Sequence, residues 1–133
     1  GEGVNVRFQV PYPQGSDRSW QFTLDDIPAS ASLELRVAHM EATAPGGDGI
    51  KKSESDEWRT YASINGQKLD PLGLNHLLPL NYRGDLRLVV PIPAGILRMG
   101  ENVLRIHQTP QKDDPNSFND CAIFGIGLEL KQK

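Results

Sequence analysis

The chain has 133 residues and a formal net charge of −3, with acidic and basic residues interspersed. No run of lysine or arginine is longer than Lys51-Lys52, so the basic surface typical of nucleic-acid binding is missing and we expect no nucleic-acid partner. No apolar stretch is long enough to predict a membrane-spanning helix, and the single Cys121 cannot form an internal disulfide.

The length predicts one domain over residues 1–133, because a chain of this size can bury about two-thirds of its unfolded surface around a single core. We expect a monomer. The chain begins Gly-Glu-Gly rather than with methionine, and this favours a domain excised from, or processed out of, a larger protein.

The first forty residues contain three stretches in which apolar and polar side chains alternate, at residues 4–10, 20–24 and 33–37. A two-residue period is typical of a strand with one buried face. Trp20 is in register with Phe22 and Leu24, so we expect it in the core. Residues 44–57 are rich in glycine, serine and charge, which predicts a long surface loop.

A further strand is predicted at residues 59–64, with Tyr61 and Ser63 on the face opposite Ala62 and Ile64. It ends at Asn65-Gly66, the strongest short signal for a hairpin. Residues 68–84 hold six leucines, which are too many for an exposed loop, but Pro71, Gly73 and Pro79 exclude a long helix. We expect a connection with one helical turn that covers an end of the core.

Residues 85–109 read as two strands joined by a tight turn, and the rest of the chain is expected to pair with them. The turn at 94–99 should place Ile96 and Leu97 under the sheet edge, and Asn102 should bond to local backbone.

The last strand, residues 121–130, is expected to bury Ala122 and Phe124 with the apolar residues that follow at every second position. Ile123, Gly125 and Gly127 would then keep the opposite face small, so that a side chain or ligand can approach closely. Seven or eight such strands joined by Gly/Pro-rich loops predict an all-β fold, an antiparallel β-sandwich of two sheets.

Several stretches carry a resemblance to a known family: Tyr61-Ala62-Ser63-Ile64-Asn65-Gly66, Val90-Pro91-Ile92-Pro93, the segment LRMGENVLRI at 97–106, and Asp120 ahead of the strand at 123–130. In these the chain resembles the galactose-binding-like jelly-roll domains of carbohydrate-active enzymes. It is most similar to the C-terminal β-sandwich domain of rhamnogalacturonan lyases, and more distantly to the sugar-binding domain of family 2 glycoside hydrolases. The first half is covered only loosely, through Trp20-Gln21-Phe22 and residues 33–38.

The resemblance implies a jelly roll of about eight strands and a noncatalytic accessory domain that binds glycan beside neighbouring domains of a parent protein. It also implies secretion or a cell-surface location, and in some members a structural calcium ion. The shared motifs are markers of the fold, and they bring no catalytic or sugar-contacting residue with them.

The sequence contains no motif that predicts an enzyme. His39, His76 and His107 stand on separate segments without metal-ligand spacing, and no nucleophile elbow or phosphate-binding glycine loop occurs. We therefore predict no catalytic residues and no required cofactor. Calcium has weak candidates in Asp113, Asp114 and Asp120, although their spacing lacks the turn glycine of an EF-hand loop.

Sugar binding needs flat aromatic rings beside planar hydrogen-bonding groups. Trp58, Tyr82, Arg83 and His107 are the predicted ligand-binding residues, and loops that are distant in sequence can meet at one end of a jelly roll. Each residue taken singly also fits a structural role at the sandwich edge. Arg105 shares the face of His107. If that face is the concave side of its sheet, the two side chains would suit an anionic sugar such as a uronate; if it is the convex side, they are only solvated.

The predicted function is therefore carbohydrate binding, by a noncatalytic accessory module of a polysaccharide-degrading enzyme, with a neutral or acidic oligo- or polysaccharide as ligand. The alternative is a structural or protein-interaction β-sandwich domain without a glycan ligand.

Overall fold

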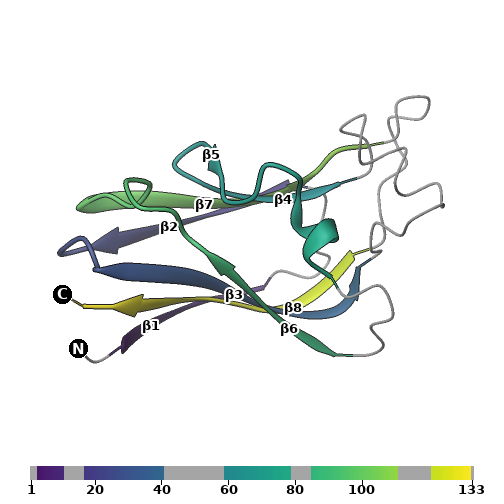
Figure 1. Cartoon of the computed structure of the whole chain (residues 1–133), viewed down its shortest axis with the longest axis horizontal. Helices are drawn as coiled ribbons and strands as arrows, with labels where there is room; N and C mark the ends of the chain where they lie inside the picture. The colour runs from purple at the N-terminus through teal and green to yellow at the C-terminus, as the bar shows by residue number, and fades with distance from the viewer. Residues whose placement is uncertain (1–2, 11–16, 41–58, 79–84, 111–120, 133) are drawn as a thin grey trace.

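The structure is a computed structural model, and it describes residues 3–10, 17–40, 59–78, 85–110 and 121–132. These residues form eight strands and one short 3-10 helix (Figure 1). In chain order they are β1 (Gly3–Phe8), β2 (Asp17–Leu24), β3 (Ser30–Met40), β4 (Thr60–Ile64), β5 (Gln67–Lys68), η1 (Leu74–Leu77), β6 (Leu86–Pro91), β7 (Gly100–Gln108) and β8 (Cys121–Lys131).

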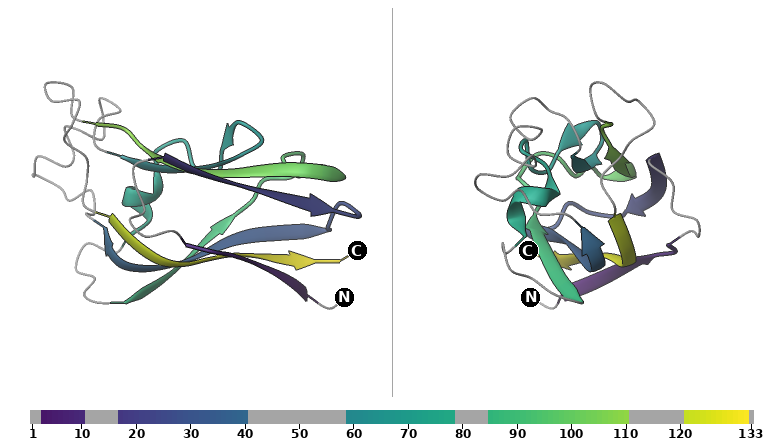
Figure 2. Two further views of the ribbon diagram at one scale, coloured as in Figure 1. Left: turned by 180° about the vertical axis from the view of Figure 1, so that it is seen from behind. Right: turned by 90° about the vertical axis from the view of Figure 1, so that its right-hand side faces the viewer.

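The strands make two antiparallel sheets of four, sheet A in the order β1-β8-β3-β6 and sheet B in the order β2-β7-β4-β5. The two sheets lie face to face as the layers of a sandwich, as the end view in Figure 2 shows. Strand β1 pairs with β8, β2 with β7, β3 with β6 and β4 with β5. This folded-over pairing is the topology of a jelly roll, so the predicted all-β sandwich of about eight strands is confirmed.

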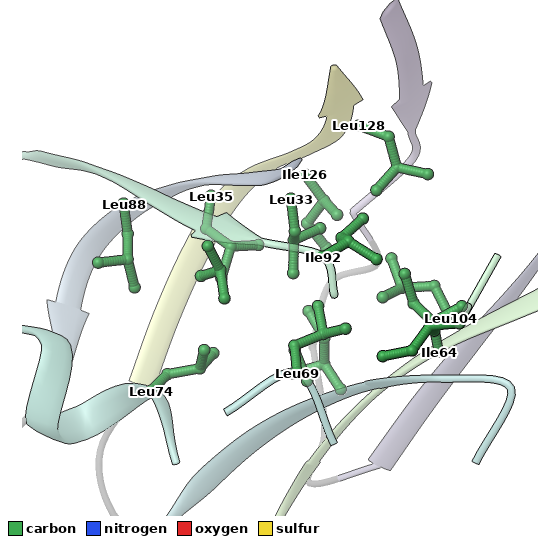
Figure 3. Close-up of a cluster of buried hydrophobic side chains, with 14 of the residues drawn as sticks. Leu33, Leu35, Ile64, Leu69, Leu74, Leu88, Ile92, Leu104, Ile126 and Leu128 are labelled. Carbon is green, nitrogen blue, oxygen red and sulfur yellow. The ribbon is translucent and has the colours of Figure 1, made fainter. Parts of the chain in front are cut away.

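The core lies between the sheets and is built by the alternation seen in the sequence (Figure 3). Leu33 and Leu35 of β3 point from sheet A toward Ile64 and Leu104 of sheet B, and all four side chains are completely buried. Burial of each such side chain contributes about 1.5–3 kcal/mol relative to exposure.

An asparagine network joins two turns at one end of sheet B. Asn65 and Gly66 have positive φ angles of 54° and 81°, as a tight hairpin requires. The Asn65 amide nitrogen donates to the Ile96 carbonyl at 2.8 Å and to the Asn102 side-chain oxygen at 2.9 Å. Asn102 in turn donates to the carbonyls of Arg98 and Gly100. The predicted local bonding of Asn102 is confirmed, and Ile96 and Leu97 are buried as expected.

The prediction for the beginning of β8 is wrong. The register between β3 and β8 shifts at Arg36, Val37 and His39, which marks a β-bulge or irregularity in the pairing. As a result Ile123 is buried, while Phe124 is 49% exposed on the outer face of sheet A. An extra residue in one strand reverses the faces of the residues beyond it, and the alternation of residue types does not reveal it.

The connection after β5 covers the core as predicted. Leu69, Leu74 and Leu78 are buried, and the predicted helical turn is η1. The buried Asn75 side chain accepts a hydrogen bond of 2.7 Å from the Thr60 amide, which fixes η1 to the beginning of β4. Leu72 faces outward.

Candidate functional site

Of the four predicted ligand-binding residues, only His107 belongs to the described part of the chain. Trp58, Tyr82 and Arg83 lie outside the described residues, as do the calcium candidates Asp113, Asp114 and Asp120. His107 is half-buried near the end of β7, with its side chain on the outer face of sheet B. The strand register places it between Asp17 of β2 and Tyr61 of β4.

Tyr61 is a buried aromatic residue on the outer face of sheet B, a face where strand residues are commonly exposed. Its ring stacks on the His107 ring at a centroid distance of 5.4 Å, and the Lys68 ammonium lies 3.8 Å from its centroid. These contacts come from β7 and β5, the strands on either side of β4. The Arg59 guanidinium donates to the Tyr61 hydroxyl at 3.3 Å. Because Tyr61 has no exposed surface, it supports the face and cannot stack on a ligand.

Arg105 is exposed on the same face, but its guanidinium already holds a carboxylate. It makes two hydrogen bonds to Asp17, of 2.9 Å from Nε and 2.8 Å from Nη2. This bonding, with the positive charge of Arg105, holds the pKa of Asp17 below its ordinary value, and His107 and Arg18 act in the same direction. The pair shows that this position suits a carboxylate, although a ligand would have to displace Asp17.

We predict that the Asp17–Arg105 pair makes a small contribution to stability that is lost at acidic pH. A lowered pKa of Asp17 in the folded state means that the pair stabilises the fold at neutral pH, and that the contribution disappears as the pH falls through that pKa. Both side chains are about half exposed, so the contribution is at most about 1 kcal/mol. Urea unfolding of Asp17→Asn against the native protein, at neutral pH and at about pH 3, should show a stability difference only at neutral pH. An equal difference at both pH values would contradict this assignment.

An open hollow lies beside Arg105 and His107, where the edge strand β2 meets the end of β1. It has a volume of about 400 Å³ and is lined by Gln9, Arg18, Ser19 and Trp20; we call it the seam hollow. The Trp20 indole N–H donates to the Gln9 carbonyl at 2.9 Å, which bridges the two sheets. Trp20 also packs against Phe8, with ring centroids 6.2 Å apart.

The seam hollow was not predicted from the sequence. Trp20 does contact the core, as expected, but it is only half-buried because β1 and β2 are edge strands of opposite sheets. Part of Trp20 therefore remains accessible to solvent. Ser19 pairs with Arg105 across β2 and β7, so the seam hollow adjoins the part of the outer face that carries Arg105 and His107.

A second hollow of about 280 Å³ lies at the opposite end of the sandwich, between the connection after β2 and the turn after β6. Apart from Ser30, the side chains that line it are apolar, including Ile27, Pro28, Ile92, Pro93 and Leu97. It offers few groups for the hydroxyls of a sugar, so the seam hollow is the better candidate.

Among the described residues, no group of three or more histidine, cysteine or acidic side chains is placed to hold a metal ion. Within the same ranges, no helix is long and apolar enough to cross a membrane. No family model matches the sequence, and its comparison with curated proteins finds no match. The candidate site therefore has to be interpreted from its own chemistry.

Proposed function

We propose that this chain is a noncatalytic carbohydrate-binding module of a larger polysaccharide-degrading enzyme that is secreted or carried on the cell surface. The observation that supports the proposal most is the seam hollow, an open space lined by a tryptophan, an arginine, a glutamine and a serine. An aromatic surface suits the apolar side of a pyranose ring, and planar polar groups suit its hydroxyls.

The size and openness of the seam hollow are consistent with the binding of a short oligosaccharide. Its volume of about 400 Å³ falls within the range of small-molecule sites, about 300–1,000 Å³. The adjoining Arg105 and His107 add cationic and hydrogen-bonding groups on the outer face of sheet B. An oligosaccharide that extends from the seam hollow across β2 would meet these groups.

Several strand ends meet at the end of the sandwich where His107 lies. The beginnings of β2, β4 and β6 and the end of β7 lie at the same end of the sandwich (Figure 1). In sequence, Trp58 directly precedes Arg59, and Arg83 precedes Asp85 by two residues. Trp58, Tyr82 and Arg83 stay predictions as further contacts.

We predict that Arg18→Ala lowers the affinity for the best oligosaccharide by about tenfold or more, because hydrogen bonds from a charged group contribute about 1.5–3 kcal/mol. Isothermal titration calorimetry with a panel of neutral and acidic oligosaccharides measures this directly. The matched control is Arg98→Ala, an exposed arginine in the turn after β6, which should leave the affinity unchanged.

Tryptophan fluorescence gives a second test, because a sugar in the seam hollow should shift the emission of Trp20. The chain has two tryptophans, so the titration is repeated with Trp58→Phe. A shift that persists in this variant belongs to Trp20, and a shift that disappears assigns stacking to Trp58 instead.

Absence of binding across the whole panel by the folded protein would reject the proposal. The alternative function, a structural or protein-interaction β-sandwich domain of a parent protein, would then be favoured. Binding that is unaffected by Arg18→Ala would reject the seam hollow as the site while leaving glycan binding in place.

A further inference from the structure

The outer face of sheet A carries three exposed arginines from three different strands. They are Arg7 of β1, Arg36 of β3 and Arg87 of β6, and they surround Glu34 of β3. The strand register aligns Arg7, Gly127 and Glu34 in one row, and Gly125, Arg36 and Arg87 in the next. We call this surface the arginine face.

Glu34 occupies the centre of the arginine face. Arg87 binds it with two nitrogens, Nε at 2.9 Å and Nη2 at 3.0 Å. The Glu34 side chain is only 16% exposed, whereas the Arg87 side chain is 53% exposed. The hydrogen bonds from Arg87 hold the pKa of Glu34 below its ordinary value, and the charges of Arg87, Arg7 and Arg36 add to this effect. One carboxylate therefore faces three guanidinium groups.

Two glycines of β8 let arginine side chains lie flat on the sheet. A Cβ atom on Gly127 would come within 2.7 Å of Nη1 of Arg7, and one on Gly125 within 3.0 Å of Cγ of Arg36. Any larger residue at these positions would lift the arginines from the surface. The sequence prediction that Gly125 and Gly127 allow close approach of a side chain is thus confirmed, and the approaching side chains are cationic.

Arginines outnumber carboxylates on the arginine face, because the four strands of sheet A contribute only Glu34 and Glu129 against Arg7, Arg36 and Arg87. Arg36 and Arg87 are direct cross-strand neighbours, an arrangement that is destabilising for like charges. Over the described part of the chain, no carboxylate forms a salt bridge with Arg7 or Arg36. An external anion would relieve this repulsion.

Phe124 adds an apolar surface to the same face. The irregular pairing of β8 turns its ring outward, where it is 49% exposed, and the Arg36 guanidinium lies 5.6 Å from its centroid. Bulges commonly re-aim one side chain in this way. A flat ring thus stands beside a guanidinium that makes no salt bridge within the described residues.

We propose that the arginine face binds a uronate-containing polysaccharide. A uronate unit joins the two features that this face offers side by side, because its ring has an apolar side for Phe124 and its carboxylate accepts two parallel hydrogen bonds from a guanidinium. A phosphate ion would use the arginines but not the ring, and a neutral sugar would use the ring but not the charges. The outer face of the sheet is open to an extended chain that crosses several strands.

The arginine face and the seam hollow are different surfaces and share no residue. Binding at the arginine face and binding at the seam hollow can therefore be confirmed or rejected separately. The probe is polygalacturonate, with neutral dextran, dextran sulfate and poly-glutamate as comparison ligands, measured by calorimetry or affinity electrophoresis at low salt and at high salt.

Arg36→Gln and Arg7→Gln should each lower the affinity for polygalacturonate by about tenfold. Phe124→Ala should lower it as well, whereas binding of short neutral oligosaccharides should not change. Arg98→Gln, in the exposed turn after β6, is the control with the same loss of charge and should leave polygalacturonate binding intact. Raised salt should weaken the native complex, because its contacts are ionic and exposed.

Glu34→Gln distinguishes a binding face from a structural ion pair. It releases Arg87 from its internal carboxylate, so it should raise the affinity for polygalacturonate several-fold. Glu129→Gln is the matched control, because Glu129 lies on the same sheet face, two residues from Gly127 in β8, and the variant has the same net charge. It should raise the affinity much less. Urea unfolding of each variant confirms that it is folded.

Three results would overturn the inference. The first is the absence of polygalacturonate binding at low salt by the folded protein. The second is equal binding of poly-glutamate or dextran sulfate, which would show an unspecific polyanion surface. The third is binding that survives Arg7→Gln and Arg36→Gln but disappears in Arg18→Gln, which would assign the acidic ligand to the seam hollow and leave the proposed function standing.

Discussion

Replacing Asn102 with alanine should lower the free energy of unfolding by about 2–4 kcal/mol. The side chain is completely buried, and it serves as acceptor and donor at once. Its oxygen accepts from the Arg98 amide and from Asn65, both at 2.9 Å, and its nitrogen donates to the Arg98 and Gly100 carbonyls. Alanine would leave several buried polar groups without partners, which costs more than the bonds themselves contribute.

Urea unfolding followed by circular dichroism measures this loss. Asn5→Ala is the matched control, because Asn5 is an exposed asparagine of β1 and its replacement should change stability by less than about 0.5 kcal/mol. If Asn102→Ala were as stable as this control, the network would not be what joins the β4–β5 hairpin to the turn before β7.

Replacing Tyr61 with alanine should have a comparable or larger effect, about 3–5 kcal/mol, because a fully buried ring is removed. His107 and Lys68, which contact the ring from the neighbouring strands, would both lose this contact. Tyr61→Phe keeps the ring and removes only the oxygen that accepts from Arg59, so it should cost about 1–3 kcal/mol.

Affinity measurements distinguish a structural role of Tyr61 from a direct contact with a ligand. Because Tyr61 has no exposed surface, Tyr61→Phe should leave the affinity for any oligosaccharide unchanged while it lowers stability. Phe124→Ala is the opposite case, since an exposed ring is removed with little effect on unfolding. A loss of affinity in Tyr61→Phe would show that a ligand reaches the Tyr61 hydroxyl.

The candidate site illustrates why its residues were only partly predictable. His107 and Arg105 could be assigned to one strand face from the alternation of β7 alone. Asp17, which occupies the Arg105 guanidinium, is 88 positions away in sequence and meets it only through the pairing of β2 with β7. Pairing between distant strands leaves no local pattern, so the ion pair could not be foreseen.

Trp20 shows the same limit in another form. Its register with Phe22 and Leu24 correctly indicates the inner side of the strand. Whether an inner side chain is enclosed depends on the position of its strand in the sheet, and β2 is an edge strand beside β1 of the other sheet. The indole is therefore half-buried and lines the seam hollow.

The sequence by itself determined the strand faces outside the beginning of β8, the Asn65-Gly66 hairpin, the turn that buries Ile96 and Leu97, and hence the all-β sandwich. These features follow from local chemistry, since the two-residue period and the tolerance for positive φ act within a few residues. Only the tertiary structure decided the register between distant strands. That register places Arg7, Arg36 and Arg87 on one face, and its irregularity in β8 turns Phe124 outward, because every residue beyond a register shift changes sides.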